Sequence, residues 1–177
     1  MRYAEVNTIV ELCLGEHPMS SQGSQTAADR FFGSLAYLLP IAEGAFFGIF
    51  VFEEFPIVRD VYQVLAPLIA INSGFGGFIL FLGLYLGVAM NPRISRFIRF
   101  NVFQAILIGI LLSLCRLLLQ ALILPLIGTG LLTQVLLNTV FFGTLAMAGY
   151  GIFMSALGKY TEIPQLSETA QMQIDRY

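Results

Sequence analysis

The chain alternates between long apolar stretches and short polar connections. The apolar stretches cover residues 31–52, 68–90, 100–124 and 131–157. Each is at least 22 residues long, and about 20 helical residues cross the hydrocarbon core of a bilayer. The pattern predicts an all-α integral membrane protein with four transmembrane helices.

The boundary between the last two helices lies inside one uncharged run. No charged residue occurs from Leu117 to Gly158, a run of 42 residues that is too long for a single membrane span. Pro125, Gly128 and Gly130 interrupt the run, and these residue types favour turns. We therefore expect a helical hairpin whose turn lies near these three residues.

Polar segments flank the predicted membrane domain. Residues 1–28 form a polar N-terminal extension, residues 29–158 the four-helix transmembrane domain, and residues 159–177 a polar C-terminal tail. The N-terminal extension lacks the basic and apolar regions of a secretory signal, and it lacks the Arg- and Ser-rich character of a transit peptide. We expect it to be part of the mature chain.

Two connections are candidates for short helices at the membrane surface. Pro56–Ala66 places Val58, Val61 and Leu65 at helical spacing, as in helices that lie among the lipid headgroups. Ile94–Phe100 leads into the third span and is the second candidate.

The composition excludes an ordinary soluble domain. Hydrophobic residues make up 57 % of the chain and charged residues 11 %, compared with roughly 45–50 % and about 25 % in globular proteins. The net charge is −2 and there is no basic tract, which argues against binding to nucleic acid. The lipid bilayer is therefore the first partner that the sequence predicts.

The few cations predict the orientation, because loops rich in Lys and Arg stay on the cytoplasmic side. With four spans, both chain ends and the connection between spans two and three share one side. That side carries Arg30, Arg93, Arg96, Arg99 and Lys159, and the opposite side carries Arg59 alone. Both termini are therefore expected on the cytoplasmic side, or on the stromal side in a plastid.

Sequence signatures of enzymes are missing. There is no Walker A motif, no HExxH, no CxxC and no Ser/His/Asp set, and the Gly-rich stretch Gly74–Gly77 has no dinucleotide-fold context. We therefore expect neither catalysis nor a cofactor, and there are almost no residues from which a metal site could be built.

Two ionisable residues lie deep inside predicted spans. Glu43 and Arg116 each cost roughly 2.5–3.5 kcal/mol at the centre of a span, so each needs a reason to be there. If both helices run outward from the cytoplasmic side, the two charges differ in depth by about 4 Å. The hypothesis is an intramembrane ion pair, and the alternative is that Arg116 snorkels outward while Glu43 is protonated or hydrated.

Uncharged polar residues also gather on helical faces. Asn101, Ser113 and Gln120 share one side of the third span with Arg116, and Gln104 lies beside them. The fourth span carries Gln134 and Asn138 on one face. Such stripes either join helices by hydrogen bonds or line a wet cavity, and both alternatives stay open.

Three arginines lead into the third span at intervals of three residues. Arg93, Arg96 and Arg99 could form one basic stripe that faces lipid phosphates. The alternative is that they serve only as the topology signal.

Four stretches of the chain together are distinctive: Ala28–Ile41 (ADRFFGSLAYLLPI), Phe55–Pro56, Asn91–Asn101 (NPRISRFIRFN) and Gln104–Leu107 (QAIL). They resemble the Tic-twenty family, whose members include the small membrane subunit of the translocon at the inner envelope of chloroplasts. The resemblance implies a four-helix membrane protein with both termini cytoplasmic or stromal. It also implies a role as channel component or scaffold in a protein-translocation complex, with other membrane subunits as partners and a polypeptide as possible cargo.

Two other functions remain as alternatives, namely a transporter of small solutes or amino acids, and a membrane assembly scaffold. Arg outnumbers Lys eight to one, which favours a cyanobacterial plasma membrane over a plastid inner envelope membrane.

Overall fold

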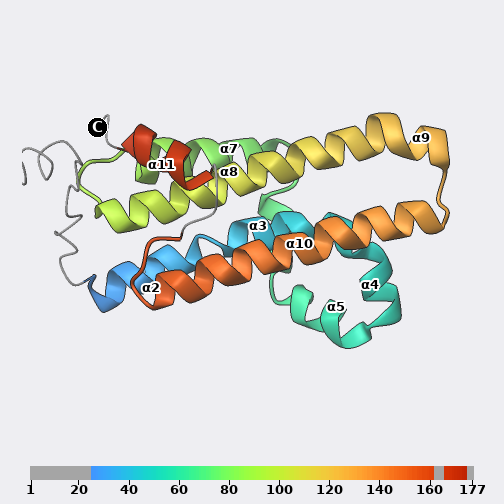
Figure 1. Ribbon diagram of the computed structural model, residues 1–177, viewed down its shortest axis with the longest axis horizontal. Coiled ribbons are helices and arrows are strands. Elements are labelled where there is room, and N and C mark those ends of the chain that lie inside the picture. Colours follow the sequence, from blue (N-terminus) through green and yellow to red (C-terminus); the bar gives the residue numbers. More distant parts are fainter. Residues whose placement is uncertain (1–24, 162–165, 175–177) are drawn as a thin grey trace, which may run out of the picture.

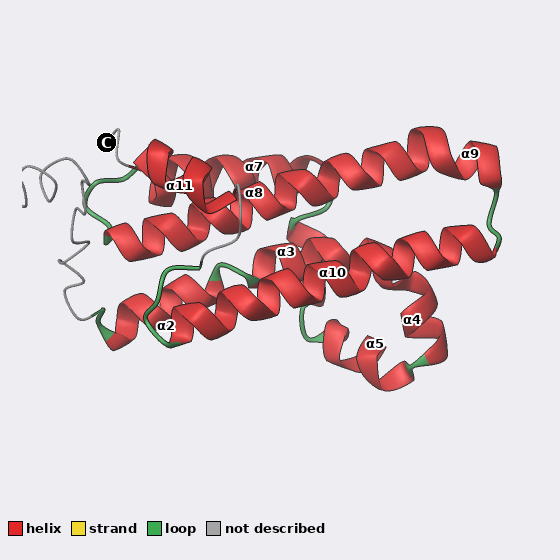
Figure 2. Ribbon diagram, viewed as in Figure 1, coloured by secondary structure: helices red, strands yellow, loops and turns green. Residues whose placement is uncertain are grey.

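The computed structural model describes residues 25–161 and 166–174 (Figure 1). Every regular element in these ranges is a helix, and the described residues contain no strand (Figure 2). The expectation of an all-α protein is therefore confirmed.

The first apolar stretch folds as a chain of short helical pieces. They are α2 (Ala27–Leu35), α3 (Leu38–Gly44), the 3₁₀ turn η1 (Ala45–Gly48) and α4 (Ile49–Glu54). Thr26 and Asp29 begin α2 with a capping box, in which each side chain accepts the backbone N–H of the other, at 3.2 and 3.1 Å. The helix thus starts before residue 31, where the apolar run begins, because capping rather than hydropathy sets its first turn.

A sharp bend follows α4 at Phe55 and Pro56. Pro56 occupies the first position of α5 (Pro56–Gln63), where its missing N–H costs nothing. The exposed apolar stripe differs from the expected one, because Val58 and Leu65 are half-buried. It consists of Ile57, Val61 and Val64, which lie three to four residues apart and are 64–80 % exposed. This apolar stripe has the spacing of a helix that lies on a membrane surface.

The second expected span, Leu68–Met90, is interrupted. It consists of α6 (Ala66–Ile71), α7 (Gly74–Leu84) and the π-helical turn η2 (Tyr85–Ala89). Gly74 has φ +56°, and a Cβ on Gly76 would lie 2.3 Å from the Ile71 carbonyl oxygen. The uncharged run hid this break, because the turn between α6 and α7 depends on backbone geometry that glycine allows and hydropathy does not record.

The last two spans form a long helical hairpin. Its first arm is α8 (Arg96–Leu118), the π-helical turn η3 (Leu119–Ile123) and α9 (Leu124–Ile127), and its second arm is α10 (Leu131–Ala156). Since α8 already begins at Arg96, no separate surface helix forms over Ile94–Phe100. A short helix, α11 (Leu166–Ile174), follows and packs on α8 and η2.

The pieces α2 and α3 lie between α8 and α10 (Figure 1). Fully buried side chains from all three layers form the core, among them Tyr37, Phe47, Ile108 and Phe141. Glycine allows α10 to approach closely, because a Cβ on Gly48 would lie 2.7 Å from the Phe141 ring. The start of α2, the α7–α8 connection and the end of α10 lie at one end of this bundle (Figure 1).

Three helices in the described part of the chain are long and apolar enough to cross a membrane: Ala27–Glu54, Arg96–Ile127 and Leu131–Ala156. The apolar helix Gly74–Ala89 is shorter. Its 16 residues reach about 24 Å, whereas the hydrocarbon core is about 30 Å thick. Length and composition therefore make this a membrane protein with three to four helices that can span.

Candidate functional site

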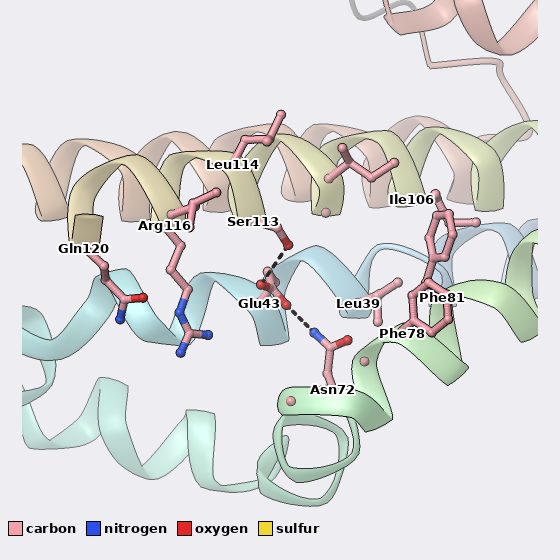
Figure 3. A pocket seen from close by; sticks show the side chains of 15 residues that line it. Leu39, Glu43, Asn72, Phe78, Phe81, Ile106, Ser113, Leu114, Arg116 and Gln120 are labelled. Carbon is pink, nitrogen blue, oxygen red and sulfur yellow. Dashed lines mark hydrogen bonds between the residues drawn. The ribbon is translucent and has the colours of Figure 1, made fainter. Parts of the chain in front are cut away.

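A polar crevice lies between α3, the α6–α7 turn and the arm formed by α8 and η3. Its volume is about 650 Å³. Apolar side chains form much of its wall, and its polar groups come from five residues: Glu43, Asn72, Ser113, Arg116 and Gln120. Figure 3 shows these side chains converging from three segments. Four of the five were singled out from the sequence, and Asn72 was not.

Glu43 is held by two neutral hydrogen-bond donors. The Asn72 amide donates to one carboxylate oxygen, and the Ser113 hydroxyl donates to the other at 3.3 Å (Figure 3). Asn72 reaches Glu43 because it ends α6 at the break in the second apolar stretch. The break therefore places a polar residue beside Glu43.

Arg116 lines the same crevice but has another neighbour. Its guanidinium carbon lies 4.4 Å from the centroid of the Phe46 ring, in a cation–π contact. Figure 3 shows the guanidinium apart from the Glu43 carboxylate, with Gln120 on the same wall. The structure therefore brings Glu43 and Arg116 to one crevice with different partners, and a direct ion pair between them inside the membrane stays a prediction.

Asn101 and Gln104 lie elsewhere, in a polar junction that is closed to solvent. The junction consists of Tyr37, Asn101, Gln104, Ser155 and Thr161, all 0 % exposed. The Tyr37 hydroxyl oxygen lies 3.1 Å from Asn101 Oδ1 and 3.0 Å from Gln104 Oε1. It also lies 3.2 Å from the Thr161 hydroxyl. Because a phenol has one proton, it can donate to one amide oxygen at a time while accepting from Thr161.

The remaining donors complete the polar junction. Ser155 donates to Asn101 Oδ1 at 2.7 Å, and the Asn101 amide donates to the Phe97 carbonyl at 2.8 Å. The Gln104 amide donates to the Thr161 carbonyl at 3.3 Å. These bonds join α8 to α10 and to the chain that follows α10. Asn101 and Gln104 thus hold helices together at this place.

Sequence reasoning missed Tyr37, Ser155 and Thr161. A lone Tyr near the end of an apolar stretch ordinarily indicates the membrane interface, and a Ser in an apolar helix ordinarily bonds its own backbone. The signal that was available is the alignment of Asn101 and Gln104 at helical spacing, since buried amides need partners. It does not reveal which other segments supply them.

Gln134 and Asn138 join neither the polar crevice nor the polar junction. Gln134 is exposed on α10, four residues before half-buried Asn138. Asn138 Oδ1 is buried and has no hydrogen-bond partner within the described part of the chain. The two residues therefore share a sequence spacing but not an environment.

The expected arginine stripe does not form as one surface. Arg93 and Arg96 are exposed, whereas Arg99 is 6 % exposed. The Arg99 Nε donates to the Ala89 carbonyl at 2.9 Å, so its charge lies at the C-terminal end of η2, where the helix dipole favours a cation. Arg99 is therefore a link between α8 and η2, because it lies on the side of α8 that this turn covers.

Within the described residues, no group of three His, Cys, Asp or Glu side chains could hold a metal ion. The polar crevice instead offers one acid, one guanidinium, two amides and one hydroxyl. These groups can hydrogen-bond a polar ligand or a peptide backbone inside an apolar surrounding.

Comparison with known proteins identifies similar chains along most of this sequence. The family model described as "Chloroplast import apparatus Tic20-like" matches residues 25–170. A Tic20 family protein from Synechocystis is 42 % identical over 158 residues, which are 88 % of this chain and 99 % of that protein. The Arabidopsis thaliana protein named "Protein TIC 20-v, chloroplastic" is 32 % identical over 88 % of this chain and 77 % of that protein. The Tic20 family protein Ycf60 of Gracilaria tenuistipitata is 34 % identical over 85 % of this chain and 77 % of that protein.

Proposed function

Because this chain belongs to the Tic20 family, we propose that it is a non-enzymatic subunit of a protein-translocation complex. In this role it is a channel component that offers a polypeptide a polar path inside the membrane. The observation that carries the proposal is the polar crevice, which Glu43, Asn72 and Arg116 line together with apolar side chains. The name of the Arabidopsis relative places that protein in the chloroplast.

The chemistry of the polar crevice suits an extended peptide. A peptide backbone carries an N–H and a C=O at almost every residue, and each costs several kcal/mol if it stays unsatisfied in hydrocarbon. The Glu43 carboxylate and the amides can accept N–H groups, and Arg116 and Gln120 can donate to carbonyls. Such contacts do not depend on the side chains of the cargo, as a carrier of many polypeptides requires.

We further propose four membrane crossings with both termini on the cytoplasmic or stromal side. The second crossing would consist of α7 and η2, extended by α6 across the Asn72 turn. Arg30, Arg93 and Lys159 support this arrangement, because they belong to the three segments at one end of the bundle, and cations mark the cytoplasmic side. The α9–α10 turn at the other end carries no charge.

Energy and partners would come from other membrane subunits, since the sequence contains no nucleotide-binding motif. The cyanobacterial plasma membrane is the favoured location. The similarity to the Synechocystis protein and the preference for Arg over Lys both support it. The plastid inner envelope membrane is the alternative.

Site-specific photocrosslinking in native membranes tests the function. A photoreactive residue at Gln120 would face the polar crevice, and one at Phe142, which is 55 % exposed on α10, serves as a matched control. We expect Gln120 to crosslink to a translocating polypeptide and Phe142 not to do so. Adducts with a small solute would instead support a transporter. Adducts with partner helices alone would support an assembly scaffold, and either result would overturn the channel proposal.

A further inference from the structure

A second cavity lies beside the polar crevice and differs from it in chemistry. Its volume is about 590 Å³, and all 13 of its lining residues are apolar. They come from α2, α3 and α6 on one side, from α7 and η2 on another, and from α8 with the residue Ile94 before it. A hydrocarbon ligand suits this cavity, because such a lining offers no side chain that could satisfy a polar group.

The depth of the apolar cavity matches one leaflet of a bilayer. Its wall on α8 runs from Ile98 to Ala105, eight residues over which the helix rises about 10 Å. A leaflet contributes half of the hydrocarbon core, or about 15 Å. A helix that spans the membrane would have to cross both leaflets, about 30 Å. An acyl chain that enters from the headgroup region occupies only one leaflet.

The lining of the cavity includes both exposed and buried side chains. Phe32 and Leu35 on α2 are 53 % and 46 % exposed, whereas Val102 and Ala105 on α8 are almost completely buried. An acyl chain can therefore enter from the bilayer between α2 and η2 without displacing the helical core.

Charge at one end of the cavity selects the headgroup. Ile94 lines the cavity directly after Arg93, which is exposed. The acid Asp29 lies near this connection, because it accepts a hydrogen bond of 2.6 Å from the Ser95 hydroxyl, and its carboxylate keeps its negative charge. Arg93 and Arg96 still give the connection more positive than negative charge, and an anionic lipid gains about 1 kcal/mol for each Arg near the headgroups.

We propose that this cavity binds one acyl chain of an anionic phospholipid, with the phosphate of the lipid beside Arg93. The lipid would fill the space between α7 and the rest of the bundle in the leaflet that contains the start of α8. The proposal does not depend on the translocation role, because it concerns a different cavity and a different ligand.

Native mass spectrometry of the full chain in detergent tests the site. The probes are phosphatidylglycerol and phosphatidylcholine with identical acyl chains. Val88→Phe fills the cavity from η2, and we expect it to weaken phosphatidylglycerol binding by about tenfold, the effect of losing burial of roughly two methylene groups. Leu86→Phe is the matched control, because Leu86 lies on the same turn, is 57 % exposed and does not line the cavity.

The headgroup is tested with Arg93→Gln, which should reduce the preference for phosphatidylglycerol over phosphatidylcholine by about fivefold. Arg59→Gln, at a distant exposed cation, should leave the preference unchanged. Glycerol phosphate without acyl chains should not compete. Competition by it, equal retention of both lipids, or equal losses in Val88→Phe and Leu86→Phe would each overturn the proposal.

A measurement on the unaltered chain guards against misfolding of the variants. Phosphatidylglycerol with a photoreactive group in its acyl chain should label peptides that contain Val102 or Leu84. Labelling confined to Leu118, which is 52 % exposed on α8 and lines neither cavity, would show lipid on the outer surface only and would contradict the proposed site.

Discussion

The ring of Tyr37 lies directly against the backbone of Gly151, so that a Cβ on Gly151 would lie 2.3 Å from the ring carbon Cε1. This contact brings α10 against the junction of α2 and α3. It also positions the Tyr37 hydroxyl, which reaches Asn101 and Gln104 on α8. One close approach thus connects three helices at the end of the bundle that contains the polar junction.

Replacing Gly151 by Ala should destabilise the protein. The added methyl group must displace the buried Tyr37 ring, and overpacking of this kind costs about 1–3 kcal/mol. Gly149→Ala is the control on the same helix, because no atom lies within 4 Å of its added Cβ. It should stabilise by up to about 1 kcal/mol through helix propensity. Thermal unfolding in detergent distinguishes them, and equal midpoints would refute the close contact.

Tyr37→Phe should also destabilise, because it leaves the buried Gln104 Oε1 without a donor, whereas Asn101 Oδ1 keeps the Ser155 hydroxyl. An unsatisfied buried group costs about 1–3 kcal/mol. Tyr62→Phe is the matched control, since the Tyr62 hydroxyl is buried and has no hydrogen-bond partner in the described residues. We expect that control to be neutral or stabilising in the same unfolding measurement. A Tyr37→Phe variant as stable as Tyr62→Phe would remove the role assigned to the hydroxyl.

Charge reversal tests whether Glu43 and Arg116 interact. Glu43→Arg places two cations in the polar crevice and Arg116→Glu places two acids there, so each single variant should lower the yield of folded protein in the membrane. The double variant restores opposite signs and should recover most of that yield. Glu54→Arg, at an exposed position on α4, should have little effect. A double variant no better than the better single one would disprove the interaction.

The apolar stripe of α5 should contact the membrane surface. A dye that responds to polarity, attached at Val61→Cys, should emit at shorter wavelength than the same dye at Asp60→Cys, and brominated lipids should quench it. The two positions are neighbours on one helix, and Val61 is 64 % exposed. Identical spectra in lipid vesicles would show that this stripe does not touch the bilayer.

Hydropathy predicted the helix boundaries well where contact with lipid alone determines them. The fourth expected span, residues 131–157, nearly coincides with α10. The first expected span, residues 31–52, lies within a longer helical segment whose start depends on the Thr26–Asp29 capping box. The second was expected as one helix, but the turn at Asn72 interrupts it.

The candidate residues divide according to packing that the sequence does not contain. Asn101, Ser113, Arg116 and Gln120 share one side of a helix, yet Asn101 lies in the polar junction and the other three line the polar crevice. Their neighbours differ because α2 and α3 cover one part of α8 while the α6–α7 turn faces another. Helical periodicity shows on which side of a helix a residue lies. It does not show which other segment packs against that side at each level along the helix.

By itself, the sequence determined that this protein lies in a membrane, that it is helical and which family it resembles. Hydrophobicity and residue strings are properties of the chain alone, so no folding is needed to interpret them. Only the tertiary structure decided that Glu43 meets Asn72, that Arg99 is buried at η2 and that two cavities of different chemistry flank α7. These features arise from contacts between distant segments, and their geometry exists only after the helices have packed.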